Sequence, residues 1–81
     1  MITSAQCRGA RGLLGWSQQK LAEKAGVGVM TVNQFEKDVI RPRRATIDVI
    51  QRALECGGVA FIEENGGGPG VRLSKPVKTV K

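Results

Sequence analysis

The chain has 81 residues, of which 41% are hydrophobic, so it can fold as one small domain with a core. Its net charge of +6 and pI near 10.0 favour a polyanionic partner, nucleic acid or an anionic membrane surface, over a basic protein that is merely soluble. One Trp, two Phe and no Tyr argue against the aromatic platforms on which unpaired bases stack, and no stretch reaches the roughly 18 apolar residues of a membrane span.

The first predicted helix runs from Thr3 to about Leu14, with Thr3 or Ser4 as its cap. Its apolar stripe comprises Cys7, Ala10, Leu13 and Leu14. Gly9 and Gly12 weaken such a helix by up to about 1 kcal/mol each relative to Ala, although they can permit close packing. Gly15 is expected to end it.

Two shorter helices follow. Ser17 is a good N-cap for a helix that runs to Ala25, and Gly26 should stop it. The next helix spans roughly residues 29–37, where Val32 and Phe35 stand three residues apart and are expected to face inward.

The loop "DVIRPRR" concentrates positive charge, and Pro42 biases Arg41 away from helical geometry. A fourth helix is predicted over residues 45–56, before Gly57–Gly58. Its core stripe comprises Ile47, Ile50, Ala53 and Leu54.

The character of the sequence changes after residue 57. "VAFIEE" and "VRLS" are short β-like runs on either side of "NGGGPG", which predicts a hairpin or a pair of edge strands. Since an isolated two-stranded hairpin is marginal in water, it should pack on the helices or pair with a second chain. We therefore divide the chain into a helical unit (1–57), a β-like extension that could dimerise (58–74) and a basic, disordered tail (75–81).

The second and third helices carry the spacing of a helix-turn-helix. A small side chain at Ala22 lets the two helices approach closely, and Gly26 suits the left-handed backbone of the turn. Val32 and Phe35 fill the angle between the helices, and Gln18 begins the second helix. These five residues together form a far more specific signal than a lone glycine between helices.

Residues 5–56 resemble the lambda-repressor-like domains of the XRE/Cro-CI regulators. The resemblance rests mainly on "LLGWSQQKLA" and "TVNQFEK", with "RP" at Arg41–Pro42 and "ATIDVIQRALE" in support. It implies an all-α, compact four- to five-helix DNA-binding domain, here with a short C-terminal β-hairpin or paired strands. It also implies a homodimer on a palindromic double-stranded operator, usually acting as a repressor.

Mapped onto this sequence, the resemblance implies that the third helix enters the major groove of DNA. The base-contacting positions would be Val29, Met30, Thr31 and Gln34. The phosphate-binding positions would be Gln18, Lys37, Arg41, Arg43 and Arg44. The alternatives are that Val29 and Met30 belong to the core and that the polar residues are ordinary solvated side chains.

Three departures from the family pattern affect these expectations. Gly28 stands at a cap position where Ser or Thr is common, and Asp38–Val39–Ile40 replaces the usual glycine-containing turn. Val29 and Met30 cannot donate hydrogen bonds but can pack on thymine methyl groups, while Gln34 can pair with adenine. We therefore predict a half-site that contains A·T pairs.

Two other classes of function compete with transcription regulation. The same fold could bind a protein, as an antitoxin binds a toxin or an antiactivator binds an activator, with Val29 and Met30 exposed for this purpose. An enzyme is disfavoured, because "NGGGPG" is followed by Val71–Arg72 instead of the Lys-Ser/Thr of a phosphate-binding loop, and no nucleophile–base arrangement can be recognised.

The remaining expectations concern cofactors and location. Cys7 and Cys56 lack the spacing of a zinc site, so we expect no metal and no other cofactor, and both should be small buried residues. The N-terminus lacks a signal-peptide pattern, which predicts a cytoplasmic protein without membrane association.

Overall fold

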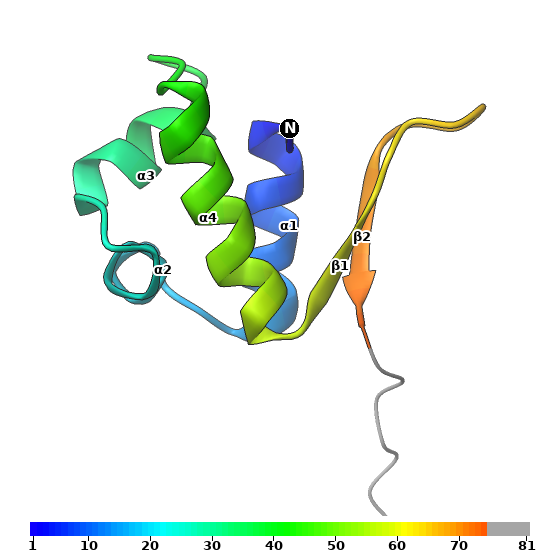
Figure 1. Cartoon of the computed structure of the whole chain (residues 1–81), viewed down its shortest axis with the longest axis horizontal. Coiled ribbons are helices and arrows are strands. Elements are labelled where there is room, and N and C mark those ends of the chain that lie inside the picture. Colours follow the sequence, from blue (N-terminus) through cyan, green and yellow to red (C-terminus); the bar gives the residue numbers. More distant parts are fainter. Residues whose placement is uncertain (75–81) are drawn as a thin grey trace, which may run out of the picture.

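A computed structural model describes residues 1–74 as four helices followed by a two-stranded antiparallel sheet (Figure 1). The elements are α1 (Ser4–Leu14), α2 (Gln18–Ala25), α3 (Val29–Glu36), α4 (Arg44–Gly57), β1 (Val59–Ile62) and β2 (Gly70–Leu73). The predicted fold class is therefore confirmed. The tail expected to be disordered, residues 75–81, lies outside the described residues.

The helix ends follow the predicted signals. Thr3 caps α1 in a capping box with Gln6, in which the Thr3 hydroxyl accepts from the Gln6 N–H and the Gln6 side chain accepts from the Thr3 N–H. Ser17 caps α2 by accepting from the Lys20 N–H at 3.0 Å. Gly15 and Gly26 end these two helices with φ values of 68° and 72°, a left-handed conformation that costs little only for glycine.

The core lies where α1, α2, α3 and α4 meet. The side chains predicted to face inward on α3 and α4 are buried, except that Ala53 is only partly buried. The buried ones are Val32, Phe35, Ile47, Ile50 and Leu54, and Leu21 and Ala22 of α2 are buried with them. Leu13 was predicted to share the apolar stripe of α1 but is 44% exposed, because Cys7, Ala10 and Leu14 set the buried face and Leu13 falls beside it.

The hairpin packs on the helices, so the first of the two expected solutions is realised. β1 and β2 pair with Val59 opposite Leu73 and Ile62 opposite Gly70. The Gln6 amide of α1 donates to the main-chain carbonyls of Ile62 at 3.2 Å and Gly70 at 2.8 Å, which ties both strands to the first helix.

Gly9 allows β2 to approach α1 closely. A Cβ atom at Gly9 would stand 3.1 Å from Cγ1 of Val71, whereas one at Gly12 would meet nothing within 4 Å. The prediction that these glycines permit close packing is therefore confirmed for Gly9 and wrong for Gly12. In Figure 1 the two strands lie beside α1, and only the connection between them, residues 63–69, projects away from the helices. Strands and connection together, residues 59–73, are called the arm here.

Within residues 1–74, no helix has the length and apolar character needed to cross a lipid bilayer.

Candidate nucleic-acid interface

The N-terminal turn of α3 is exposed while its opposite face is locked into the core. Met30 is 62% exposed and Val29 is 40% exposed, whereas Val32 and Phe35 are buried. The alternative that Val29 and Met30 are core residues is therefore wrong. Gly28 caps the helix without a side-chain hydrogen bond, as its missing side chain requires.

Thr31 and Gln34 share a cleft with the loop that precedes α4. The cleft has a volume of about 350 Å³. Its lining residues are Thr31, Gln34, Ile40, Pro42, Arg43 and Thr46. The fold thus brings two predicted base-contacting residues next to one predicted phosphate-binding arginine, although they lie about ten residues apart in sequence.

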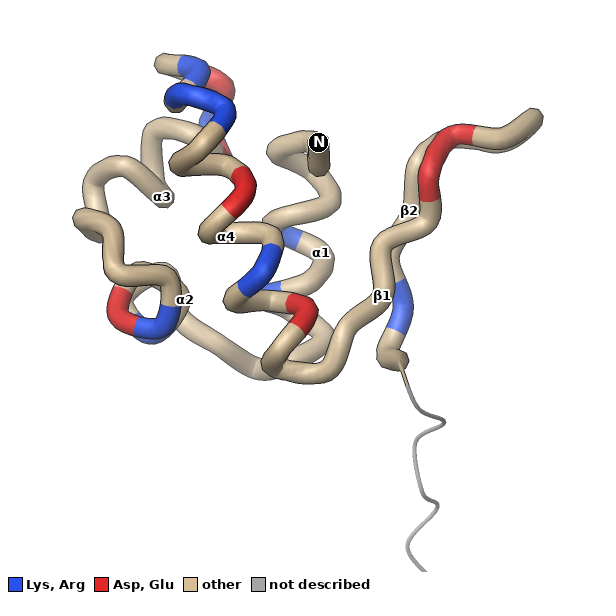
Figure 2. Tube along the Cα trace, viewed as in Figure 1, with Lys and Arg blue, Asp and Glu red and all other residues tan. Residues whose placement is uncertain are grey.

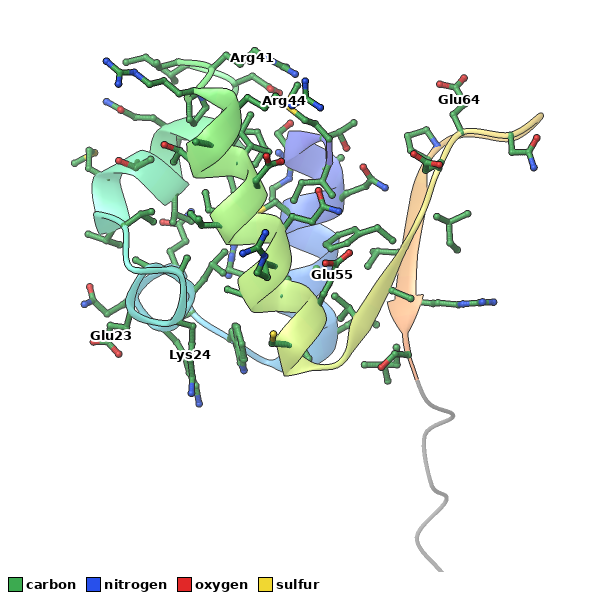
Figure 3. The ribbon with its side chains drawn as sticks, in the orientation of Figure 1. Glu23, Lys24, Arg41, Arg44, Glu55 and Glu64 are labelled. Carbon is green, nitrogen blue, oxygen red and sulfur yellow. The ribbon has the colours of Figure 1, made fainter. Side chains whose placement is uncertain are left out.

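The three loop arginines gather at one end of α4. Arg41, Arg43 and Arg44 are exposed, with Arg43 at the N-cap position and Arg44 as the first residue of the helix. Figure 2 shows this concentration of positive charge beside α3, and in Figure 3 the labelled Arg41 and Arg44 side chains reach outward there. Lys37, which ends α3, is also exposed. Of the predicted phosphate-binding residues, Arg43 therefore lies beside Thr31 and Gln34, and Lys37 lies at the end of α3. Arg41 faces the start of the chain, where it lines a cleft with Ile2 and Thr3.

Gln18 has a more constrained environment than the sequence predicted. Its side-chain amide donates to Oε1 of Glu36 at 3.1 Å, and its carbonyl oxygen accepts from Asn33 at 3.1 Å. Most of its side-chain hydrogen-bonding capacity is thus used inside the protein. Its backbone N–H, in the first turn of α2, is left pointing along the positive end of the helix dipole.

Glu36 is the centre of this internal network. It is 2% exposed, and its carboxylate accepts from Arg11 Nε and Nη2, both at 2.7 Å, and from Cys7 Sγ at 3.2 Å. Arg11 also donates to the carbonyl of Trp16 at 3.0 Å, and Arg8 donates to the carbonyl of Glu36. One buried carboxylate therefore connects α1, α2 and α3 behind the exposed face.

The pKa values follow from this arrangement. Burial by itself would raise the pKa of Glu36, but the hydrogen bonds from Arg11, Gln18 and Cys7 and the charge of Arg11 outweigh it and lower the pKa below the ordinary 4.5. The same hydrogen bond to Glu36 raises the pKa of Arg11. Burial, together with the nearby Glu36 carboxylate, raises the pKa of Cys7, which remains a neutral thiol and a hydrogen-bond donor.

Sequence reasoning missed Arg11, Asn33 and Glu36. The available signal was that Glu36 follows Val32 by four positions and Phe35 by one, which places it on the buried side of α3. A carboxylate on such a face requires a cationic partner. The partner, 25 positions earlier in the chain, could not be identified from spacing.

The turn after α3 takes a definite path without glycine. Asp38 adopts a left-handed conformation, with φ 57°, which is unusual for a residue with a side chain. Its carboxylate accepts from the Ser4 hydroxyl at 2.9 Å, so the turn is tied to the start of α1. Asp is among the few residues that tolerate this conformation, which explains how it replaces the expected glycine.

The two cysteines differ in environment. Cys7 is fully buried, as predicted, but Cys56 is exposed on α4, so the prediction for Cys56 was wrong. The helix turns its core stripe of Ile47, Ile50 and Leu54 inward and leaves position 56 outside it. No group of three or more potential metal-ligating side chains occurs in the described part of the chain.

Comparison with known proteins agrees with this geometry. The family model described as helix-turn-helix matches residues 8–61, which is more than half of the chain and includes α2, α3 and α4 in full. No curated protein matches the chain.

Proposed function

Since the chain belongs to the XRE/Cro-CI family of helix-turn-helix DNA-binding regulators, we propose that it represses transcription in the cytoplasm by binding a palindromic operator as a dimer. The family is regulatory, and its members are typically not enzymes. The observation that carries the proposal is the outward-facing N-terminal half of α3, held from behind by the core and flanked by exposed cations.

The base contacts are assigned to four positions of α3. These are Val29, Met30, Thr31 and Gln34. Gln34 would pair with adenine through its amide, and Val29 and Met30 would pack on thymine methyl groups, so the preferred half-site contains A·T pairs. The polar partners of Gln18 and Glu36 hold α3 at a fixed angle to α2, which supports a rigid approach to the groove.

Phosphate contacts would surround this surface. Arg41, Arg43 and Arg44 lie on one side, Lys37 lies at the end of α3, and the backbone N–H of Gln18 offers a donor at the start of α2. Because the Gln18 side chain is occupied by Glu36 and Asn33, the role of Gln18 in phosphate binding is assigned to its main chain.

Dimerisation is proposed because one domain of this size offers few contacts for tight specific binding, and two-fold pairing doubles them. The surfaces available for pairing of two protomers are α4 and the arm, because α3 and the loop that carries Arg41 and Arg43 are assigned to DNA contacts. This assignment gives residues 58–74 a dimerisation role that they share with α4, and it makes residues 1–57 the DNA-binding unit.

The test is selection of bound duplexes from a random library, followed by affinity measurements over a range of salt concentrations. Four cations per protomer predict a slope of log affinity against log salt of about −3.6 for each half-site, at about −0.9 per phosphate. A palindromic, A·T-containing consensus with this slope is the expected result. Binding that is indifferent to salt and sequence would contradict the proposal.

A second candidate is a protein-interaction role, as an antitoxin or an antiactivator. It is favoured by the exposure of Val39 at 64% and Ile40 at 54%, which adds apolar surface to that of Met30. Co-purification with a toxin or activator, together with no retardation of any duplex in the library, would favour this candidate over DNA binding.

A further inference from the structure

An apolar groove lies on the side of the domain formed by α2 and α4. We define the α2–α4 groove by Trp16, Val49, Ala53 and Cys56, flanked by Lys24 and Arg52; its volume is about 390 Å³. Gly57 leaves space for the Trp16 ring in this groove, because a Cβ atom at position 57 would lie 2.7 Å from that ring. Val49 is 38% exposed and Cys56 is exposed, so apolar surface is left uncovered.

The groove is separate from the proposed DNA contacts. In Figure 3 Lys24 lies at one end of the helical body and Arg41 and Arg44 at the other. None of the six residues that define the groove belongs to the proposed base or phosphate contacts. A molecule seated in the groove would therefore leave α3 free.

The two cations of the groove have no acidic partner in the described structure. Within residues 1–74 the Arg11–Glu36 pair is the only ion pair, so Lys24 and Arg52 are both unmatched there. An occupant that suits this groove should carry an apolar anchor with negative charge beside it.

The arm of the same chain has these properties. Glu63 and Glu64 are the only adjacent acidic residues in a chain of net charge +6, and both are exposed. Ile62 precedes them, is 42% exposed, and pairs with Gly70, so no cross-strand side chain covers it. We define the acidic tip as Ile62, Glu63 and Glu64.

One chain cannot bring these two features together. Glu64 lies far out on the arm in Figure 3, at the opposite side of the molecule from Lys24, and the arm is fixed to α1 by the Gln6 amide. A second copy of the chain meets the requirement, because its arm can present the tip to the groove of the first.

We propose that the acidic tip of one protomer docks in the α2–α4 groove of its partner, with Ile62 against Trp16 and the two glutamates facing Lys24 and Arg52. Reciprocal docking of the two acidic tips, with each arm still bound to its own α1, defines a closed two-fold dimer in which each groove is filled. This inference rests on the dimerisation in the proposed function and names the surfaces that would form it.

The test is a charge exchange across the interface, followed by sedimentation equilibrium of the full chain. E63K/E64K and K24E/R52E should each raise the dissociation constant of the dimer about tenfold, because favourable pairs become repulsive. The quadruple variant should return to near the wild-type value. The two double variants change the net charge in opposite directions, so a general effect of net charge would not weaken the dimer in both.

Cys56 supplies a second measurement that does not depend on the dissociation constant. It lines the groove and is exposed, whereas Cys7 is fully buried. Its rate of alkylation by a maleimide should fall as the concentration of the wild-type chain rises and should stay fast in E63K/E64K. Circular dichroism of each variant verifies that these exposed substitutions leave the fold intact.

The outcomes separate the two proposals. A dimer whose dissociation constant is unchanged in both double variants, with Cys56 still reactive, would overturn the docking and leave dimerisation standing. A chain that stays monomeric at all concentrations would overturn both, while DNA binding is judged independently on the selected duplex. Protection of Cys56 only when another protein is added would assign the groove to that protein and overturn the proposal.

Discussion

The Arg11 guanidinium of α1 donates two parallel hydrogen bonds to the Glu36 carboxylate of α3, from Nε to Oε2 and from Nη2 to Oε1, each 2.7 Å long. The Glu36 side chain is 1% exposed and the Arg11 side chain is 21% exposed. The helix that would meet DNA is thus anchored to α1 by a nearly buried, bidentate ion pair, in addition to its apolar face. Such a pair fixes geometry because breaking it leaves a charge without a partner in the interior.

Arg11→Ala is expected to destabilise the fold by about 3 kcal/mol, because Glu36 then remains buried without its cation. Urea denaturation followed by circular dichroism measures the change. Arg72→Ala, which removes an exposed arginine from β2, serves as the matched control and should alter the free energy of unfolding by less than about 0.5 kcal/mol. Equal effects of the two substitutions would remove the special role assigned to Arg11.

Acid is expected to weaken the protein through Glu36. Its pKa in the folded state lies below the ordinary 4.5, so ionised Glu36 stabilises the fold above pH 4.5, and this contribution is lost as the pH falls through the lowered pKa. The Glu36→Gln variant has no ionised carboxylate at this position, so it lacks this stabilisation at neutral pH. The difference in unfolding free energy between wild type and variant should therefore shrink as the pH falls below 4.5. Parallel pH profiles would argue against this coupling.

Two glycines on helices should respond in opposite directions to alanine. In Gly57→Ala the new Cβ would stand 2.7 Å from Trp16 and 2.9 Å from Leu14, which costs about 1–3 kcal/mol through overpacking. In Gly12→Ala nothing lies within 4 Å, so higher helix propensity should stabilise the fold by up to about 1 kcal/mol. Thermal unfolding measures both, and Trp16 fluorescence should change only for Gly57→Ala.

The turn at Asp38 should prefer glycine to alanine. Asp38→Ala loses the hydrogen bond from Ser4 and keeps a side chain in the left-handed region, whereas Asp38→Gly loses only the bond. The glycine variant should therefore be about 1 kcal/mol more stable than the alanine variant. Adding Ser4→Ala to either variant tests the hydrogen bond itself. The bond is already absent in both variants, so the second substitution should cause no further loss of stability from it. Equal stability of the two variants would show that the backbone conformation carries no strain.

Gln34 and Arg43 line the same cleft but should differ in their effect on DNA binding. Gln34→Ala should lose about 1–3 kcal/mol of discrimination at one A·T position, because the amide that pairs with adenine is gone. Arg43→Ala should weaken all duplexes alike and reduce the salt slope by about 1. Competition assays with operators substituted one base pair at a time distinguish the two. Unchanged preference in Gln34→Ala would show that another face of α3 contacts the bases.

The sequence alone determined the elements and most of the core. Caps and stops are local signals, and Ser17, Gly15 and Gly26 act on their own helices within a few residues. The inward faces of α3 and α4 also follow from periodicity, because a helix places Val32 and Phe35, or Ile47, Ile50 and Leu54, on one side whatever it packs against. These are short-range consequences of backbone geometry, so the chain order suffices to predict them.

Only the tertiary structure decided which distant side chains meet. The pairing of Arg11 with Glu36, the capture of the Gln18 amide by Glu36 and Asn33, and the contact of Ser4 with Asp38 all join separate helices or turns. Leu13 and Cys56 were misplaced because the boundary of a buried face depends on the neighbouring elements. The α2–α4 groove and the arm likewise exist only once the elements are packed, since a cleft is a property of the space between them.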